Sequence, residues 1–312
     1  MRIFEGLTDL TPIKKAVVTI GTFDGVHIGH QEILKTVISE AKKIGGESVL
    51  LTFYPHPRMV LYPEDKGLLL LQTQTEKLEK LASIGLENAV IYPFSKEFAE
   101  FSAKSFVEEI LIKGLQAKKV IIGYDHQFGH QREGNLAFLQ SYADQGFFEL
   151  MEIPAEQIDE VYISSSKIRN AILEGEMSTA NSCLGAAFEL TGTVTLGLQN
   201  GRRIGFPTAN IQLKDAHKII PANGVYAVKI EVEGKLQTGM MNIGWRPTVE
   251  EEKLERKIEV HLFDFNREIY GSECRVEVHQ FFRPEHKFPN LEGLKAQIQQ
   301  DEAAIRAFFH TA

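Results

Sequence analysis

Short apolar runs alternate with segments of helical periodicity along the first half of the chain. Five apolar runs predict buried strands, at residues 16–20, 48–53, 89–92, 119–123 and 149–153. Between them, apolar residues recur three and four positions apart. This spacing predicts one helix that ends near residue 43 and further helices at residues 75–84, 102–115 and 136–142. Strands that alternate with helices predict a doubly wound α/β domain, with a parallel sheet covered by helices on both faces.

The pattern changes at residues 183–187, after a short connecting helix expected at residues 177–184. Beyond it, turn residues separate short β-rich runs at residues 192–198, 224–232, 236–243, 257–263 and 275–281. Such runs predict a small antiparallel β-barrel or sandwich, and residues 291–309 predict a terminal amphipathic helix. We therefore divide the chain into domains 1–184 and 185–312.

The first strand leads into a glycine-rich turn and then into a helix start that carries two histidines. Gly21, Gly25 and Gly29 punctuate this stretch, and the spacing of His27 and His30 places them on one helical face. Unpaired backbone N–H groups and the helix dipole favour phosphate binding there. The stretch has neither a Walker Gly-Lys-Ser/Thr nor a Gly-x-Gly-x-x-Gly fingerprint. Half of a metal site and a purely structural role are the alternatives for the histidine pair.

The loops that carry His27 and His56 and the loop after Gly123 all follow the carboxyl ends of predicted strands, where ligands of such folds bind. Residues 123–134 form a polar, glycine-rich loop after one predicted strand, which by itself is typical of a solvated surface loop. Residues 163–175 predict another helix, with Ser164 or Ser165 as its N-cap. Two phosphate-binding helix starts in one sheet are a stronger signal than either alone.

Residues 201–211, GRRIGFPTANI, carry the candidate chemistry of the second domain. Gly201 and Gly205 allow the backbone to approach phosphates closely. Thr208 and Asn210 lie in an extended segment, where a hydroxyl and an amide oxygen can face one Mg²⁺. The alternative interpretation is a polar loop of the barrel.

Glu259 lies on a predicted strand whose residues alternate between apolar and polar positions. The alternation places Glu259, His261 and Phe263 opposite the apolar set. A solvent-facing carboxylate is the ordinary interpretation of such a residue.

Several of these segments resemble known signatures. Residues 21–30 resemble the His-Xaa-Gly-His signature of nucleotidyltransferases, and nearly the whole chain resembles the bacterial bifunctional riboflavin kinases and FMN adenylyltransferases, also called FAD synthetases. ISSSKIR is similar to the family's Ile-Ser-Ser-Thr-Xaa-Ile-Arg, with Ser166 keeping the hydroxyl of the usual Thr. GRRIGFPTANI resembles the riboflavin kinase signature, and GVYAV, MNIGWRPTV, EVHLFDF and IYG also match that module.

For the first domain, this resemblance implies adenylylation of FMN by ATP to give FAD. His27, His30 and Arg169 would steady the triphosphate and the departing pyrophosphate, and Asp125 and Phe128 would contact the flavin. Arg132 is a weaker candidate for a phosphate contact. The implied ATP- and phosphate-binding residues are Gly21, Thr22, Phe23, Asp24, Gly29, Ser164 and Ser165.

For the second domain, the resemblance implies a β-barrel riboflavin kinase. Gly201, Gly205, Thr208 and Asn210 would bind ATP, the last two also Mg²⁺, and Glu259 would be the general base. Mg²⁺ is implied in both sites. Two alternatives stay open, namely a nucleotidyltransferase for another phosphorylated acceptor and a non-catalytic flavin or nucleotide sensor.

Composition narrows the remaining classes of partner. The chain of 312 residues is 43% hydrophobic and 24% charged, as in ordinary globular proteins. The net charge of −8, with no basic stripe, argues against a nucleic-acid partner. Two cysteines in no metal or redox spacing, no signal-peptide pattern and no long apolar run predict a soluble cytoplasmic protein without a membrane partner. No pattern indicates an oligomeric state.

Overall fold

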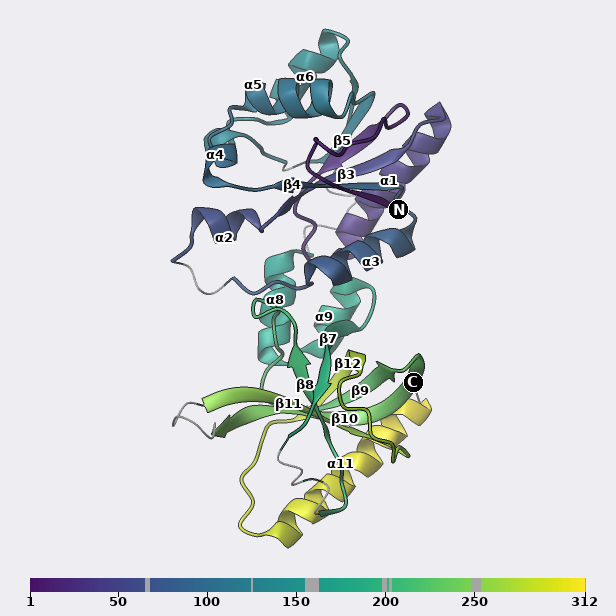
Figure 1. Cartoon of the computed structure of the whole chain (residues 1–312), viewed down its shortest axis with the longest axis vertical. Helices are drawn as coiled ribbons and strands as arrows, with labels where there is room; N and C mark the ends of the chain where they lie inside the picture. The colour runs from purple at the N-terminus through teal and green to yellow at the C-terminus, as the bar shows by residue number, and fades with distance from the viewer. Residues whose placement is uncertain are drawn as a thin grey trace. The chain divides into compact units, whose positions relative to one another are not determined.

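The computed structural model describes residues 1–64, 68–124, 126–154, 163–197, 201, 204–247 and 254–311. The chain forms two compact units, Met1–Ser165 and Ser166–Ala312, which Figure 1 shows in order of sequence from purple to yellow. Each unit has its own sheet and its own core. The first unit matches the predicted doubly wound α/β domain, and the second matches the predicted barrel.

The first unit is built on a six-stranded sheet in the order β1-β4-β3-β2-β5-β6. All neighbouring strands are parallel. The strands are β1 (Arg2–Glu5), β2 (Val17–Ile20), β3 (Ser48–Tyr54), β4 (Asn88–Pro93), β5 (Lys119–Gly123) and β6 (Glu149–Ile153). The sequence pattern missed β1, because this edge strand buries only Phe4 and therefore has no continuous apolar run.

Helices follow the strands as expected, with local differences at a few turns. The helical segments of this unit are α1 (Ile28–Ile44), α2 (Pro57–Leu61), α3 (Gln74–Ile84), α4 (Lys96–Ala99), α5 (Ala103–Ser105), the π-helix η1 (Phe106–Gly114), the 3₁₀ turn η2 (His130–Arg132) and α6 (Leu136–Asp144). The helix expected at residues 102–115 is present, but most of it is wound as a π-helix. The short helix α2 begins at Pro57, soon after β3, and the sequence pattern did not predict it.

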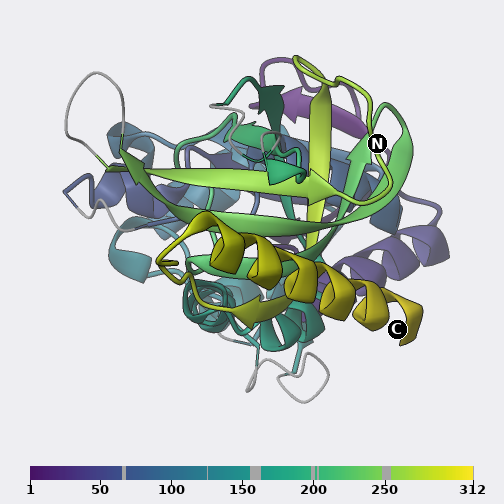
Figure 2. The same ribbon diagram turned by 90° about the horizontal axis from the view of Figure 1, so that it is seen from below.

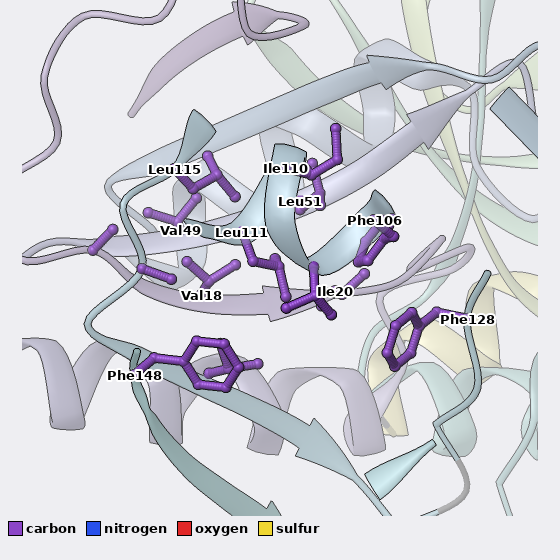
Figure 3. Packing of buried hydrophobic residues seen from close by; sticks show 14 of the residues in the cluster. Val18, Ile20, Val49, Leu51, Phe106, Ile110, Leu111, Leu115, Phe128 and Phe148 are labelled. Carbon is purple, nitrogen blue, oxygen red and sulfur yellow. The ribbon is translucent and has the colours of Figure 1, made fainter. Parts of the chain in front are cut away.

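Alternate residues of the central strands enter separate cores on the two faces of the sheet. Val18 of β2 lies in the cluster that contains η1, as Figure 3 shows, together with Leu51 of β3. Val17 and Leu50 lie in the other cluster, with α1 and α3. Burial on both faces explains why these strands are continuous apolar runs rather than alternating ones.

The second unit is a closed barrel with the strand order β10-β11-β8-β7-β12-β9. Its strands are all antiparallel to their neighbours. They are β7 (Phe188–Thr195), β8 (Ala209–Leu213), β9 (Gly224–Val232), β10 (Lys235–Pro247), β11 (Leu254–Leu262) and β12 (Glu273–Arg283). Closure decides between the barrel and the sandwich, and it depends on β8, which the sequence pattern did not predict as a strand.

The terminal helix α11 (Leu291–Thr311) packs along the barrel, as Figures 1 and 2 show in yellow. Ile305 enters a buried cluster with barrel residues, and Asp301 accepts hydrogen bonds from the Arg283 guanidinium, the shortest at 2.6 Å. Phe263 also lies in this cluster and is 2% exposed, together with Met240, which the strand register pairs with His261. Phe263 therefore shares the face of Glu259 and His261, as the alternation predicted, and α11 covers this part of the face.

Two helices precede the barrel, α8 (Ser165–Glu174) and α9 (Met177–Leu184). Both belong to the barrel unit, except for Ser165, the first residue of α8. The side-chain amide of Asn181 joins α9 to two strands of the barrel, β7 and β12. Its oxygen accepts from Phe188 N at 2.8 Å, and its nitrogen donates to Val278 O at 2.9 Å. The functional boundary at residues 184/185 stays a prediction.

These contacts predict that the second unit needs its two helices for full stability. A fragment of residues 188–312 exposes barrel surface that α9 covers and loses the Asn181 hydrogen bonds, so it should unfold at lower urea concentration than a fragment of residues 166–312. Circular dichroism during urea unfolding measures the difference. Asn181→Ala in the longer fragment should cost about 1–3 kcal/mol, because it leaves buried backbone groups unpaired. Equal midpoints for the two fragments would contradict the role of the helices.

Candidate functional site

The loop between β2 and α1 leaves the carboxyl end of an interior strand of the first sheet. Phe23 and Val26 have positive φ angles of 49° and 36°, so the turn is tightly wound. A Cβ at Gly21 would lie 2.8 Å from the Phe23 ring, which explains why glycine stands there. The sharp turn lets α1 begin directly above the strand end, where an anion can meet its unpaired N–H groups.

His27 caps this helix, and its ring lies against that of His30. The His27 Nδ1 atom accepts a hydrogen bond from His30 N at 3.4 Å, and the two rings stack with centroids 3.6 Å apart. Phe23 also stacks on His30, at 4.5 Å. The structure therefore brings together the two histidines that the sequence singled out.

Burial keeps both imidazoles neutral. It lowers the pKa of His27 to about 4, although the charge of Asp24 opposes the shift. The pKa of His30 lies well below its usual range because of burial, and the charges of His27 and Lys77 lower it further. In a neutral His27 whose Nδ1 accepts, Nε2 carries the hydrogen and can donate it to a ligand oxygen.

His30 also carries a polar atom whose partner the described chain does not supply. Its Nδ1 is buried and has no hydrogen-bond partner among the described residues. Within the same residues, no group of three His, Cys, Asp or Glu side chains could hold a metal ion. The described residues therefore give no support to the metal alternative for the histidine pair. A bound ligand that forms a hydrogen bond with His30 Nδ1 fits the site better.

Asp24 anchors the loop from its inner side. This carboxylate is 5% exposed and accepts hydrogen bonds from Leu71 N at 3.1 Å and Gln72 N at 3.3 Å. Ser165 Oγ donates to Asp24 O at 2.9 Å. Asp24 and Ser165 therefore hold the loop in place, while their contacts with ATP stay predictions.

The flavin-side residues are only partly placed. Asp125 lies outside the described residues. Phe128 is 8% exposed in the core of Figure 3, and a Cβ at Gly134 would lie 2.6 Å from its ring. Arg132 is exposed, with a positive φ of 62°. Phe128 thus has a packing role in the loop, and its contact with flavin stays a prediction.

The residues implied at the start of α8 lie at a helix terminus, as expected. Ser164 immediately precedes the helix, and Arg169 is half-buried within its second turn. Arg169 belongs to the second unit, so the structure does not fix its position relative to the histidines. Its role as a phosphate ligand stays a prediction.

The second candidate site is a cavity of about 1450 Å³ in the barrel unit. Thr208, Asn210 and Glu259 all line it. Strand register places Asn210 of β8 directly beside Glu259 of β11, and Glu259 directly beside Asn242 of β10. Laterally paired residues point to the same face, so a row of polar side chains faces the cavity.

Glycines allow the backbone to approach this row closely. A Cβ at Gly197 would lie 2.1 Å from Asn210 Nδ2, and one at Gly201 would lie 2.3 Å from Phe206 O. Gly205 has a positive φ of 93° but open space around it, so conformation rather than crowding requires glycine there. The expected role of Gly201 and Gly205 in shaping a phosphate loop is consistent with these positions and stays a prediction.

Asn242 and Glu285 belong to the same site, and the sequence reasoning missed both. Asn242 Nδ2 donates to Glu285 Oε1 at 3.2 Å, and both residues line the cavity. Asn242 is a polar residue within an apolar strand, which was a usable signal. Glu285 lies in the segment between β12 and α11, and only the folded barrel shows that it reaches Gly244, whose Cβ would lie 2.0 Å from its Oε1.

Together, the fold and these sites are those of a two-domain transferase, with a nucleotidyltransferase-like parallel sheet and a barrel that has an oxygen-rich cavity. The family model described as FAD synthetase matches residues 11–167, and the model described as riboflavin kinase matches residues 184–309. Each model therefore covers one of the two kinds of site.

Curated relatives extend the match to nearly the whole chain. A bifunctional riboflavin kinase/FMN adenylyltransferase from Listeria monocytogenes is 42% identical over 299 residues, covering 96% of this chain and 94% of the relative. The proteins of that name from Bacillus subtilis and Escherichia coli are 37% and 36% identical, covering 94% and 99% of this chain and 93% and 98% of their own lengths. The chain belongs to the family of bifunctional riboflavin kinases/FMN adenylyltransferases.

A solved structure supports the same fold over the full length. It is named as a macrolide-efflux protein from Streptococcus pneumoniae, with a TM-score of 0.89, 33% identity and coverage of 98% of each chain. That name describes the other protein and is not carried over. In the present chain, the described helices include none long and apolar enough to cross a membrane.

The neutral state of His27 predicts a pH dependence of stability. The unfolded chain protonates His27 below about pH 6.5, whereas the folded unit does so only near pH 4. The free energy of unfolding should therefore fall as the pH drops from 6.5 toward 4, by roughly 3 kcal/mol for this group.

Urea unfolding between pH 4.5 and 7.5, followed by circular dichroism, measures this change. His27→Asn lacks the titrating ring and should flatten that part of the profile relative to the unsubstituted protein. Parallel profiles for the two proteins would show that His27 does not titrate in this way.

Proposed function

We infer that this chain makes FAD from riboflavin in two ATP-dependent steps. The second unit phosphorylates riboflavin to FMN and releases ADP, and the first unit adenylylates FMN to FAD and releases pyrophosphate. The observation that carries this proposal is the match of each family model to its own part of the chain, one covering the histidine site and the other the barrel cavity. We also propose a cytosolic location for the enzyme, in keeping with its soluble substrates.

In the barrel, Glu259 is the candidate general base. The 5′-hydroxyl of riboflavin must lose a proton as its oxygen bonds to the γ-phosphorus of ATP, and the bond to the leaving ADP oxygen breaks. A half-buried carboxylate in the cavity wall can accept that proton. Asn242 and Asn210 flank Glu259 and are placed to orient it and the substrates.

The oxygen donors of the cavity fit a magnesium ion. Mg²⁺ binds hard oxygen ligands and usually takes only one or two from the protein, with phosphates and water completing its shell. The Thr208 hydroxyl and the Asn210 amide oxygen would hold it, as the family signature implies. When bound, the ion would neutralise charge on the ATP phosphates. We propose that adenylylation also uses Mg²⁺.

In the first unit, the nucleophile is already ionised. An oxygen of the FMN phosphate attacks the α-phosphorus of ATP, and the bond to the pyrophosphate oxygen breaks, so no proton has to be removed. The protein needs only to position the reactants and stabilise charge. His27 Nε2–H, His30 and the N–H groups of the α1 start are the candidate donors to the phosphate oxygens.

The remaining predicted ligands complete this proposal. Ser164, Ser165 and Arg169 would bind the departing pyrophosphate, and Asp125 and Phe128 would bind on the flavin side. Another phosphorylated acceptor and a non-catalytic sensor were the alternatives. The full-length likeness to bifunctional relatives favours FMN and catalysis over both.

The kinase assignment predicts a selective effect of Glu259→Gln. The amide keeps the shape of the side chain but cannot accept the proton, so riboflavin phosphorylation should fall about 10²–10⁴-fold. Adenylylation of supplied FMN should persist, because it occurs in the other unit. The matched control is Glu231→Gln, since Glu231 is an exposed glutamate on strand β9 of the same barrel. A folded Glu259→Gln protein with unimpaired kinase turnover would refute the base assignment.

The adenylylation assignment predicts the reverse selectivity for His30→Ala. Loss of one preorganised group at the reacting phosphates typically costs about 10²–10³-fold in rate. FAD formation from FMN should fall by this factor, while riboflavin phosphorylation in the same sample serves as the control for folding of the other unit. Chromatography of the flavins measures both rates. An unchanged FAD rate would place the reaction away from His30.

A further inference from the structure

A buried lysine lies beneath the histidine loop, and neither the sequence signatures nor the proposed mechanism uses it. Lys77 of α3 is 7% exposed, and Thr52 of β3 is fully buried. Lys77 Nζ donates to Thr22 O at 3.3 Å and to Thr52 Oγ1 at 3.3 Å. Thr52 Oγ1 also donates to Thr22 O, at 3.2 Å. Two donors from separate elements thus converge on one carbonyl of the loop.

This contact turns the Thr22 carbonyl toward the interior of the unit. A carbonyl oxygen that faced the phosphates would repel them, whereas N–H groups on the opposite side of the loop attract them. Binding the carbonyl from below therefore favours the loop conformation that suits an anion.

A neutral donor would be enough to hold a carbonyl, so the charge of Lys77 needs its own explanation. Burying an ammonium group is costly, because the group gives up its hydration. In the described part of the chain, Lys77 forms no ion pair with a carboxylate, and burial lowers its pKa to about 8, with partial compensation by the charge of Asp24. Asp24 does not depend on Lys77 for its hydrogen bonds, since backbone N–H groups of Leu71 and Gln72 donate to it.

The charge acts on the place where the phosphates would bind. Lys77 Nζ bonds directly to a carbonyl of the histidine loop, and its charge is also one of the causes that lower the pKa of His30. In a buried setting such a field is weakly screened and stabilises a polyanion more than it would in water. The substrate would then add to the countercharge that Asp24 supplies only in part.

We propose that Lys77 is a positioning residue for adenylyl transfer, which holds the Thr22 carbonyl away from the triphosphate and supplies a buried positive charge beneath the phosphate loop. This inference rests on the proposed adenylylation of FMN in the first unit. It concerns the reaction rate rather than the folding of the unit, and the two can be separated by variants that differ in charge and in hydrogen bonding.

The test compares Lys77→Gln and Lys77→Met in the full-length chain. Gln can still donate to Thr22 O and Thr52 Oγ1 but has no charge, and Met has neither property. Lys80→Gln, at a more exposed position about one turn further along the same helix, is the matched control. Each protein is assayed for kcat and KM of FMN adenylylation, for riboflavin phosphorylation, and for its thermal unfolding temperature.

We expect Lys77→Gln and Lys77→Met each to lower kcat of adenylylation by about 10²-fold. Their unfolding temperatures should stay equal or rise, because removal of a buried charge relieves its desolvation cost. Lys80→Gln should match the unsubstituted protein, and riboflavin phosphorylation should be unchanged in all variants.

Two outcomes would overturn the proposal. Adenylylation by Lys77→Gln within about threefold of the unsubstituted rate would show that a neutral donor suffices. Lower unfolding temperatures in both Lys77 variants, together with the loss of activity, would assign Lys77 a structural role. If the unsubstituted protein itself makes no FAD from FMN, the proposed function fails instead, so the two failures are distinguishable.

Discussion

The hydrogen bond from His30 N to His27 Nδ1 is the interaction on which the first site depends. It satisfies one of the open N–H groups at the start of α1 and fixes which nitrogen of His27 carries the hydrogen. The donor that remains, Nε2–H, belongs to a neutral ring, because burial lowers the pKa of His27. The site can therefore offer directed hydrogen bonds to phosphate without changing its charge near neutral pH.

The barrel achieves a comparable arrangement through strand register. Asn210, Glu259 and Asn242 lie side by side on three strands, and their alignment follows from the pairing of the distant β8 with β11 and of β11 with its neighbour in sequence, β10. A shift of one residue in either pairing would turn part of the row away from the cavity. Closure of the barrel, against which α11 packs through Ile305 and the Arg283–Asp301 ion pair, thus determines the geometry of this row.

Sequence patterns predicted the parallel sheet well because its strands are buried on both faces. Strand β5, with four of its five residues buried, begins and ends where the apolar run does. Prediction failed where tertiary contacts override local pattern. Strand β8 is short and follows Pro207, so it becomes a strand only through its partners β7 and β11. Phe263 lies on the predicted side of its strand, but a cluster that includes Ile305 of α11 buries it there.

The site residues show the same division. Local motifs identified both histidines of the first site and, in the barrel, Asn210 and Glu259. Within each unit, the fold places these residues next to each other. Asn242 lies in the matched stretch MNIGWRPTV but was not singled out there, and Glu285 and Lys77 were not singled out either, since their importance comes from neighbours on other strands and helices. Lys77 in particular sits in a run of charged residues that looks like an ordinary solvated helix face, although the fold buries it.

The central claim is that one chain carries both reactions in sequence. Incubation of the purified protein with riboflavin, ATP and Mg²⁺, followed by chromatography of the flavins over time, tests it most directly. FMN should appear first and then decline as FAD accumulates, with one pyrophosphate released for each FAD formed. Formation of FMN without any FAD, or no conversion of riboflavin, would contradict the claim.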